Sequence, residues 1–346
     1  MSATSALRVA VIGGGFGQQV HVPAFRQDAR ASVALLCMST EARAREVASR
    51  LGVPRASGSW AAVVEDPAID IVTISVPPAL QAEIALAAVT RGKHVFLEKP
   101  VAMTAEQARP LAQALAANPA VVCAVDFEFR ELAAWQRARQ LLAEGAIGKL
   151  RHVYLNWRAE TFAYRDLSRK SWKREREAGG GTLNLFVAHS VDLVAWMLAP
   201  IARVAGRLTR PAPDAAESRV DAWLALADGT PVTLAVAADA TGASEHRMEF
   251  YGDDGAMVLD NRGGDYAAGF SLTVSRRGQP PAQVELPVAE PGDGRVLAVA
   301  SLVRRFLDAT GGGASVSPGL ADGLAAQRAL DALREADRTG TWQSLS

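Results

Sequence analysis

The sequence predicts an α/β protein of two domains: an N-terminal domain with a doubly wound parallel sheet, and a C-terminal α+β domain with a large, mostly antiparallel open sheet. Three observations predict this. The chain has 346 residues, which is enough for two domains. Over residues 1–125, short apolar runs alternate with helical segments, as in a parallel sheet covered on both faces. Over residues 126–346, β-rich segments separated by turns such as ADGT and GDDG replace that alternation.

The first domain is predicted from its apolar runs and from the helical segments between them. The predicted strands are 7–12, 32–38, 69–75, 94–97 and 120–125, and the predicted helices are 41–51, 59–65, 79–91 and 104–117. Thr104 opens the last of these helices, and Gln107 follows three residues later. This spacing is typical of a capping box.

The second domain begins with a helix over 131–144, which ends at Gly145, and a strand over 150–158. A charged and aromatic section follows over 159–178, and the apolar periodicity from 182 to 198 is helical. Further strands are predicted near 202–209, 219–227, 231–238, 246–251, 255–260 and 269–275, and two final helices near 294–309 and 319–337.

Composition argues against several classes of protein. Thirty-seven Lys and Arg residues balance thirty-seven Asp and Glu residues, so charge gives no reason to expect binding to nucleic acid or to an anionic membrane. No apolar run approaches the roughly 18 residues of a membrane span, and the N-terminus does not resemble a signal peptide. Cys37 and Cys123 lie in apolar runs, which favours reduced core residues over a disulfide. We therefore expect a soluble cytoplasmic protein.

The stretch VIGGGFGQQVHVPAF, residues 11–25, is typical of a turn that binds the pyrophosphate of a dinucleotide. Gly13 allows the tight strand-to-helix turn, and Gly15 lets the backbone approach the pyrophosphate. Gln18 replaces the third glycine of the G-x-G-x-x-G motif, and Gly17 is the candidate for the close helix–strand contact instead. Pro23 predicts a kink or restart in the following helix. A plain structural turn is the alternative, but the position after a buried strand favours a Rossmann cofactor site.

The end of the second strand bears on the choice of cofactor. A site that prefers NAD usually has an acidic residue here, whereas this chain has Ser39 and Thr40, followed by Arg43 and Arg45. Hydroxyl and guanidinium groups suit a 2′-phosphate, which a carboxylate would repel. The sequence predicts a preference for NADP(H), with NAD(H) also possible. The alternative is that Arg43 and Arg45 are only solvated helix residues.

With AAVTRGKHVFLEKPVAMT, residues 87–104, the chain resembles the glucose–fructose oxidoreductase/inositol dehydrogenase (Gfo/Idh/MocA) family. GKHVFLEKP is the element most specific to that family. The resemblance also covers the glycine turn, FEFRELAAWQRARQLLAEGAIGKLRHV (127–153) and GGGTLNLFVAHSVDLVAWML (179–198), in order along the chain. Beyond residue 200 only the β-rich pattern agrees.

The resemblance implies an N-terminal Rossmann domain that holds NAD(P) and a C-terminal domain that covers the nicotinamide. It implies hydride transfer between nicotinamide and a sugar, cyclitol or related polyol or keto compound, in a homodimer or homotetramer. The family's Glu-Lys-Pro lysine, which reaches the substrate and is often joined to the proline by a cis peptide, maps to Lys99. The candidate cofactor-binding residues are then Gly13, Gly15, Phe16, Gly17, Ser39, Thr40, Arg43, Ser75, Pro77, Gln81, Glu98 and Lys99.

The family's later motif maps only in part. Its three glycines match residues 179–181 and its histidine matches His189, but Leu185 stands where the family has an aspartate. Gln81 likewise replaces the usual histidine after the Pro-Pro turn. Asn184 is an imperfect substitute for the aspartate, because neighbours on a helix point about 100° apart. Asp192 lies three residues beyond His189, where it could orient that histidine or serve as a structural partner of the Rossmann domain.

Lys99 and His189 are the candidate catalytic residues. Oxidation of a carbinol requires its hydroxyl proton to leave as the carbonyl forms, and reduction requires a proton donor. Lys99 follows strand 94–97, at the edge where open α/β sheets bind ligands. The alternatives are a surface lysine paired with Glu98 and a satisfied core histidine. The candidate substrate-binding residues are Arg158, Trp172, Asn184 and His189.

The expected partner is a small sugar-like or polyol-like substrate. No metal site is predicted, because the histidines show no ligand spacing with acids or cysteines. Two other functions stay open at this point. One is a hydrolase or lyase with a tightly bound NAD that cycles between redox states, and the other is a non-catalytic NAD(P)-binding regulator.

Overall fold

The computed structural model describes residues 6–287 and 291–345, which form two compact units. The first contains the chain up to Glu128 together with Arg295–Leu324, and the second contains Phe129–Gly294 together with the chain from Ala325. The sequence placed the boundary at 125/126, a few residues earlier. It also assigned 295–324 to the second domain, whereas this segment packs within the first unit.

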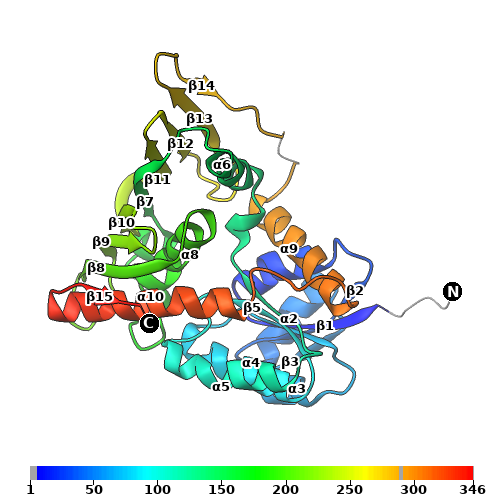
Figure 1. Ribbon diagram of the computed structural model, residues 1–346. Helices are drawn as coiled ribbons and strands as arrows, with labels where there is room; N and C mark the ends of the chain where they lie inside the picture. The colour runs from blue at the N-terminus through cyan, green and yellow to red at the C-terminus, as the bar shows by residue number, and fades with distance from the viewer. Residues whose placement is uncertain (1–5, 288–290, 346) are drawn as a thin grey trace. The chain divides into compact units, whose positions relative to one another are not determined.

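The first unit is built on a six-stranded sheet with the order β3-β2-β1-β4-β5-β6. Figure 1 draws this part of the chain in blue and cyan, with α9 in orange. All of its strand pairs are parallel. The strands are β1 (Leu7–Ile12), β2 (Ala31–Cys37), β3 (Arg55–Ser57), β4 (Ile71–Ile74), β5 (His94–Glu98) and β6 (Cys123–Asp126), and the helices are α1 (Val22–Phe25), α2 (Glu41–Leu51), α3 (Trp60–Glu65), α4 (Pro78–Thr90), α5 (Ala105–Ala117) and α9 (Gly294–Thr310). The strand order reverses between β1 and β4, which is where sheets of this type bind ligands.

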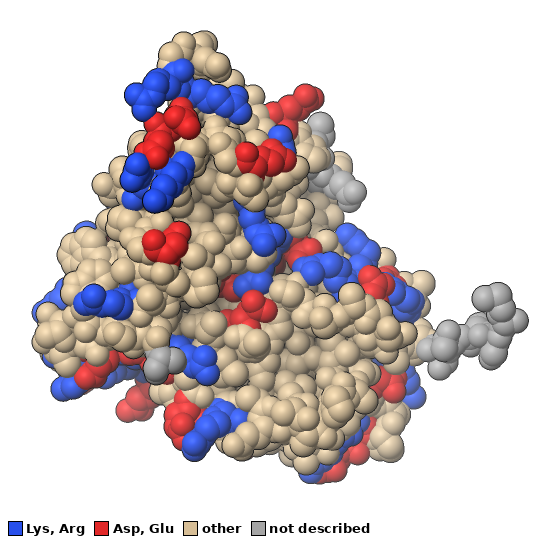
Figure 2. Space-filling view, viewed as in Figure 1, with Lys and Arg blue, Asp and Glu red and all other residues tan. Residues whose placement is uncertain are grey.

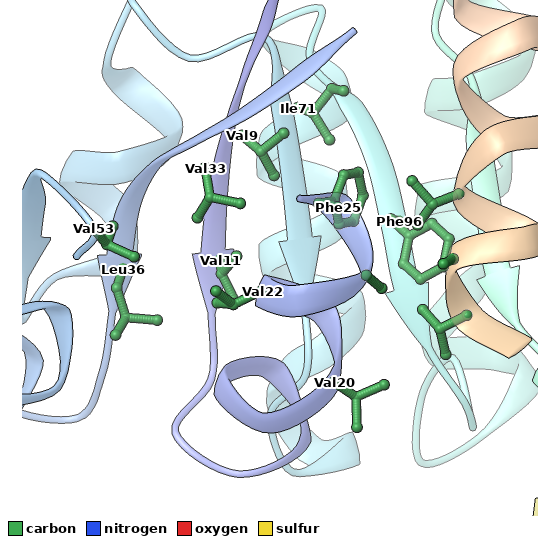
Figure 3. Packing of buried hydrophobic residues seen from close by; sticks show 14 of the residues in the cluster. Val9, Val11, Val20, Val22, Phe25, Val33, Leu36, Val53, Ile71 and Phe96 are labelled. Atoms are coloured by element: carbon green, nitrogen blue, oxygen red, sulfur yellow. The ribbon is translucent and has the colours of Figure 1, made fainter. Parts of the chain in front are cut away.

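One face of this sheet is covered by α1, α2 and α9. Val9 and Val11 of β1 are fully buried in a cluster that also holds Phe25 and Phe96, whose rings meet edge to face at 5.5 Å (Figure 3). Phe306 of α9 meets both rings edge to face. Burial of these side chains explains why 295–324 belongs to the first unit: burying one large aromatic residue stabilises the fold by roughly 1.5–3 kcal/mol.

The second unit is built on a nine-stranded sheet with the order β14-β13-β12-β11-β7-β10-β9-β8-β15. Its pairs are antiparallel except for β7 and β10, so the predicted mostly antiparallel sheet is confirmed. The strands are β7 (Leu150–Glu160), β8 (Ile201–Thr209), β9 (Arg219–Leu226), β10 (Pro231–Ala237), β11 (Asp239–Gly252), β12 (Gly255–Asn261), β13 (Ser271–Arg276), β14 (Ala282–Gln283) and β15 (Gln343–Ser344). Its helical segments are α6 (Ala133–Ala143), α7 (Phe162–Arg165), η3 (Trp172–Arg174), η4 (Leu183–Val187), α8 (Ala188–Met197) and α10 (Leu320–Thr339), the last of which begins in the first unit.

Several local predictions can be compared with the structure directly. Thr104 accepts a hydrogen bond from the backbone N–H of Gln107, so the predicted helix cap is present. Cys37 and Cys123 are buried free thiols, as expected. The regular helix predicted over 182–198 is wrong in its first turns, which form the π-helix η4 before α8 begins.

The described surface gives no sign of a membrane span or of a single-sign charged patch on the face in view. In the described part of the chain, no helix has both the length and the apolar character needed to cross a bilayer. Figure 2 shows Lys and Arg interspersed with Asp and Glu on that face. Intermixed charges of this kind fit the neutral net charge of the sequence.

Candidate active site and cofactor-binding turn

The glycine turn after β1 has the geometry expected of a pyrophosphate-binding turn. Gly13 has a φ of 141°, and a Cβ there would lie 2.1 Å from the backbone oxygen of Ser75. At Gly15, by contrast, a Cβ would meet nothing within 4 Å, so the backbone faces open space. A Cβ at Gly17 would lie 3.2 Å from Val11 and 3.4 Å from Ser75. Gly17 thus makes the close helix–strand approach that Gln18 cannot make.

The helix after the turn restarts, as Pro23 predicts. The π-helix η1 (Gly17–His21) runs first, and α1 then begins with Pro23 in its first turn. Phe16 immediately precedes η1, and its ring meets His21 edge to face at 5.5 Å. The Gln18 side chain donates to the backbone oxygen of Gly14 and accepts from Arg50 3.1 Å away. These contacts brace the glycine turn from its outer side.

The residues predicted to meet the cofactor's ribose lie at the end of β2 and the start of α2. Thr40 is the N-cap of α2 and accepts from the backbone N–H of Arg43. Ser39 and the Arg43 side chain are exposed, whereas Arg45 pairs with Glu41. The guanidinium of Arg43 is therefore not part of the ion pair that holds Arg45.

The connection after β4 carries three further candidates. The backbone N–H of Ser75 donates to Ile12 at 2.8 Å, which ties this connection to the end of β1. Pro77 is the N-cap of α4. Gln81 is buried in α4, and its Nε2 donates to the backbone oxygen of Pro100 at 2.6 Å. Gln81 is thereby bonded to the residue that follows Lys99. The Lys99–Pro100 peptide itself is cis, as the family motif implies.

Lys99 follows β5 directly and is half-buried. Its neighbour Glu98 does not behave as a surface carboxylate, because its Oε1 lies 3.2 Å from Nε2 of His21. The same nitrogen lies 3.2 Å from Oδ2 of Asp126, at the end of β6. Sequence reasoning missed His21 and Asp126. A signal was available: Glu98 and Asp126 end neighbouring parallel strands, whose carboxyl ends meet at one edge.

Among the described residues, one group of three side chains brings possible metal-ligand atoms within 4.8 Å of one another, and it is His21, Glu98 and Asp126. Its members contact one another at hydrogen-bond distances. Burial alone lowers the pKa of His21, but hydrogen bonds to Asp126 and Glu98 and the charges of both carboxylates outweigh it and raise that pKa to about 9. A metal ion bound at this nitrogen would therefore have to displace a tightly held proton.

His189 lies on α8 in the second unit and is 3% exposed. Its ring packs against Phe129 at 4.9 Å and Trp157 at 6.2 Å. Three residues along, Asp192 accepts a bidentate pair of hydrogen bonds from Arg130, with Nε 2.9 Å from Oδ2. Arg130 belongs to the second unit, so Asp192 anchors α8 within its own unit rather than serving as a partner of the first.

Leu185 is half-exposed, and Asn184 beside it is buried. The Asn184 side chain donates to the backbone oxygen of Gly179 at 3.0 Å and accepts from Arg334 at 2.6 Å. Through these two bonds, the Asn184 amide connects the glycine run (residues 179–181) to α10. Leu185 stands at the position of the family aspartate, and neither it nor Asn184 carries a carboxylate.

The other two substrate candidates lie in different surroundings. Trp172 is half-buried in η3, and a Cβ on Gly180 would lie 2.5 Å from its backbone oxygen, so η3 packs directly on the glycine run. Arg158 is exposed and bonds to Glu245 and Asn156. Successive strand residues face opposite sides of a sheet, so Arg158 faces away from the side on which Trp157 meets His189.

A doubly wound sheet, a glycine turn at the strand-order reversal and a lysine at the end of β5 agree with a Rossmann-type, NAD-binding oxidoreductase. Residues 7–127 match the family model described as an oxidoreductase family with an NAD-binding Rossmann fold, and residues 135–258 match the Gfo/Idh/MocA C-terminal domain. The chain belongs to the Gfo/Idh/MocA oxidoreductase family.

Individual relatives agree over nearly the whole chain. An uncharacterized oxidoreductase of Synechocystis is 30% identical over 362 residues, covering 99% of this chain and 97% of that protein. Levoglucosan dehydrogenase of Pseudarthrobacter phenanthrenivorans is 26% identical over 385 residues, covering 97% of each. A solved levoglucosan dehydrogenase in complex with NADH and L-sorbose matches with a TM-score of 0.88 at 25% identity, covering 99% of this chain and 100% of that chain.

Proposed function

We propose that this protein is an NADP(H)-preferring dehydrogenase that transfers a hydride between nicotinamide and a sugar, cyclitol or related polyol. The observation that carries the proposal is Lys99, which is half-buried directly after β5 and next to Pro100, whose carbonyl oxygen accepts a hydrogen bond from the buried Gln81. The relatives' activity on levoglucosan supports the substrate class. The family's redox chemistry supports the reaction type.

The cofactor would be held by the glycine turn and by the ends of β2, β4 and β5. Open backbone at Gly15 and helix-start N–H groups suit a pyrophosphate, so the residues present fit a dinucleotide. Ser39, Thr40 and the exposed Arg43 suit a 2′-phosphate better than NAD's bare hydroxyls, which supports NADP(H), although the levoglucosan dehydrogenase complex contains NADH. When bound, the nicotinamide supplies or accepts the hydride.

Lys99 is the proposed acid and base. In oxidation its neutral amine takes the proton of the substrate hydroxyl as the carbonyl forms, and in reduction its ammonium returns that proton to the oxygen. His189 is proposed to orient the substrate. Packing against Phe129 and Trp157 fixes its ring, and the Arg130–Asp192 pair fixes the helix that carries it.

Substrate binding is proposed to involve Trp172, whose segment packs on the glycine run. An indole ring suits the apolar face of a sugar ring. Asn184 would act through the position of that run rather than by direct contact, because both ends of its amide are bonded within the protein. Substrate contact by Arg158 stays a prediction. Its placement does not support that contact, because Arg158 lies on the side of β7 opposite to Trp157 and His189.

We also propose that two copies pair through the open face of the nine-stranded sheet, in the cytoplasm. Trp223 is 54% exposed and Tyr154 is 41% exposed, and both lie directly across from Thr233 in neighbouring strands. Exposed aromatic side chains that lie close together on one sheet face are typical of a surface that another chain covers. The free thiols of Cys37 and Cys123 fit a reducing compartment.

The test is a screen of the purified protein with NADP and NAD against aldoses, anhydrosugars, inositols and their keto forms, with reduced cofactor followed at 340 nm. Net production of reduced cofactor in step with a keto product supports the proposal. Product formation with no net cofactor reduction would show the redox-cycling hydrolase or lyase instead. Tight cofactor binding with no turnover of any compound would favour a non-catalytic regulator.

A further inference from the structure

Three buried residues in adjacent strands form a row across the nine-stranded sheet. Trp157 on β7 lies directly opposite His246 on β11, and His246 lies directly opposite Asn261 on β12. Directly opposed residues point to the same face of a sheet. The rings of Trp157 and His246 are stacked, with their centroids 4.0 Å apart. The row therefore lies on the face on which Trp157 meets His189.

The Asn261 side chain holds the connection between β12 and β13, residues 262–270. Its Nδ2 donates to the backbone oxygens of Asp265 at 2.9 Å and Ala268 at 2.8 Å. Its Oδ1 accepts from the backbone N–H of Gly263 at 2.7 Å. Three hydrogen bonds from one buried side chain fix the conformation of this loop. A loop that is already ordered loses little freedom when a ligand binds to it.

The loop brings the half-buried ring of Tyr266 to the rings that surround His189. The Tyr266 centroid lies 5.9 Å from that of Phe129 and 6.5 Å from that of Trp157. His189 lies 4.9 Å from the same Phe129 ring and 6.2 Å from the same Trp157 ring. Tyr266 and His189 therefore border the same two aromatic rings, and all four residues belong to the second unit.

Two further half-buried aromatic side chains border this group. Phe186 of η4 meets Trp157 edge to face at 4.7 Å, and Phe270 at the end of the loop meets His246 at 5.4 Å. Phe186 directly follows Leu185, which stands at the family aspartate position. This chain therefore has an apolar and an aromatic side chain in succession where the family motif implies a carboxylate.

Buried polar atoms within the aromatic group also point to a ligand. Both ring nitrogens of His246, and Nε1 of Trp135 on α6, have no hydrogen-bond partner among the described residues. The two rings are 5.3 Å apart. Buried polar groups are normally hydrogen-bonded, and leaving one unsatisfied is costly. A hydroxyl group, either of a sugar or of a water that the sugar holds, can donate to an imidazole nitrogen and accept from an indole N–H.

The charges near this group do not favour an anionic ligand. Burial lowers the pKa of His246 to about 3, so its ring is neutral at physiological pH. Arg262, the basic residue of the loop, is paired with Glu245 and Asp260. Asp265 adds a carboxylate to the same loop. A ligand with a phosphate or carboxylate group would therefore meet a carboxylate and an already paired guanidinium.

We propose that Tyr266, Phe270 and Phe186 form a subsite that binds the ring of an uncharged sugar or cyclitol. Tyr266, which borders the rings around His189, is its specificity-determining residue. The aromatic rings contact the apolar C–H face of the ligand, and the Tyr266 hydroxyl bonds to a ligand hydroxyl. The inference rests on the proposed function and narrows its substrate class, because it excludes sugar phosphates and sugar acids.

The first test observes Tyr266 directly and needs no turnover. The chain has four tyrosines, so protein labelled with 3-fluorotyrosine gives four 19F signals, and Tyr266→Phe assigns the signal of Tyr266. The neutral probes are levoglucosan, D-glucose and myo-inositol, and the charged probes are D-glucuronate and D-glucose 6-phosphate, each titrated with and without NADPH. We expect at least one neutral probe to shift the Tyr266 signal saturably and both charged probes to leave it in place. A Tyr266 signal that no neutral probe moves, or that the charged probes move at the same concentrations, would overturn the proposal.

The second test uses the substrate that the screen identifies. We expect Tyr266→Ala to raise KM about tenfold, which corresponds to one strong aromatic contact, while kcat changes less than about threefold. Tyr266→Phe keeps the ring and should raise KM by less than about threefold. Trp342→Ala is the matched control, because Trp342 is an exposed aromatic residue next to β15, at the sheet edge opposite the loop. This control should leave both constants unchanged.

Several results separate this inference from the proposed function. Should Tyr266→Ala not fold, Phe270→Leu, which removes a ring and keeps an apolar side chain, carries the same expectation for KM. Kinetic constants in the Tyr266 and Phe270 variants equal to those of Trp342→Ala would overturn the subsite and leave the dehydrogenase intact. A saturable shift of the Tyr266 signal in a protein that oxidises no sugar or polyol would instead overturn the proposed function and keep the subsite.

Discussion

The glycine turn allows a sharp prediction, because two of its glycines do different work. In Gly13→Ala the new methyl group would lie 2.1 Å from the backbone oxygen of Ser75 and 2.8 Å from its carbonyl carbon. Side-chain carbons do not approach other heavy atoms within 3.0 Å, so the β4–α4 connection must move. The φ of 141° adds roughly 1–3 kcal/mol of backbone strain, and overpacking adds about 1–3 kcal/mol. We expect a loss of about 2–6 kcal/mol in the free energy of unfolding.

The matched variant is Gly15→Ala, where a methyl group meets nothing within 4 Å. Replacing glycine without strain stabilises a protein by about 0.4–1 kcal/mol, because the unfolded chain loses freedom. The same methyl group would occupy the space that the pyrophosphate needs against the backbone. We therefore expect Gly15→Ala to keep or slightly raise stability while cofactor affinity falls more than about tenfold.

Urea unfolding followed by circular dichroism measures the first effect, and titration with NADPH followed by fluorescence measures the second. Gly13→Ala should lose both stability and affinity, and Gly15→Ala should lose affinity alone. The reasoning is refuted if Gly13→Ala unfolds at the wild-type urea concentration, or if Gly15→Ala binds NADPH as tightly as the wild type.

Three further predictions concern charges. Arg130→Met and Asp192→Leu should each lower the free energy of unfolding by about 3–5 kcal/mol, since each removes one partner of a buried ion pair, whereas the double variant should recover most of the loss in urea melts. Arg43→Ala should weaken NADP(H) binding and leave NAD(H) binding unchanged, and equal losses in calorimetric titrations would contradict the cofactor assignment. Because the pKa of His21 is about 9 folded and 6.5 unfolded, stability should be highest below pH 6.5 and fall by about 3 kcal/mol as pH rises through 9; a flat series of urea melts would contradict this.

The fold and the cofactor turn were predictable because their signals are local. Alternating apolar runs determine strands, Thr104 and Gln107 mark a helix start, and Gly13 marks a backbone conformation that side chains disfavour. The replacement of the third glycine was also interpretable, since Gly17 packs against Val11 as expected. Each inference used residues within a few positions of one another.

The missed features depend on contacts between distant parts of the chain. His21 meets Asp126 across 105 positions, and its apolar flanks give no sign of a charged partner. The Arg130–Asp192 pair spans 62 positions. The packing of α9 with the first unit depends on Phe306 reaching Phe25 and Phe96, which an amphipathic pattern alone cannot assign to one sheet or the other. The π-turn before α8 has no established local signal.

The central claim is that the Lys99 amine exchanges a proton with the substrate oxygen. Its most direct test is Lys99→Met, which keeps the length of the side chain and removes the amine, compared with the wild type on the substrate that the screen identifies. The account predicts a fall in kcat of about 10²–10⁴-fold with an unchanged Kd for NADPH. Turnover within about twofold of the wild type would contradict it.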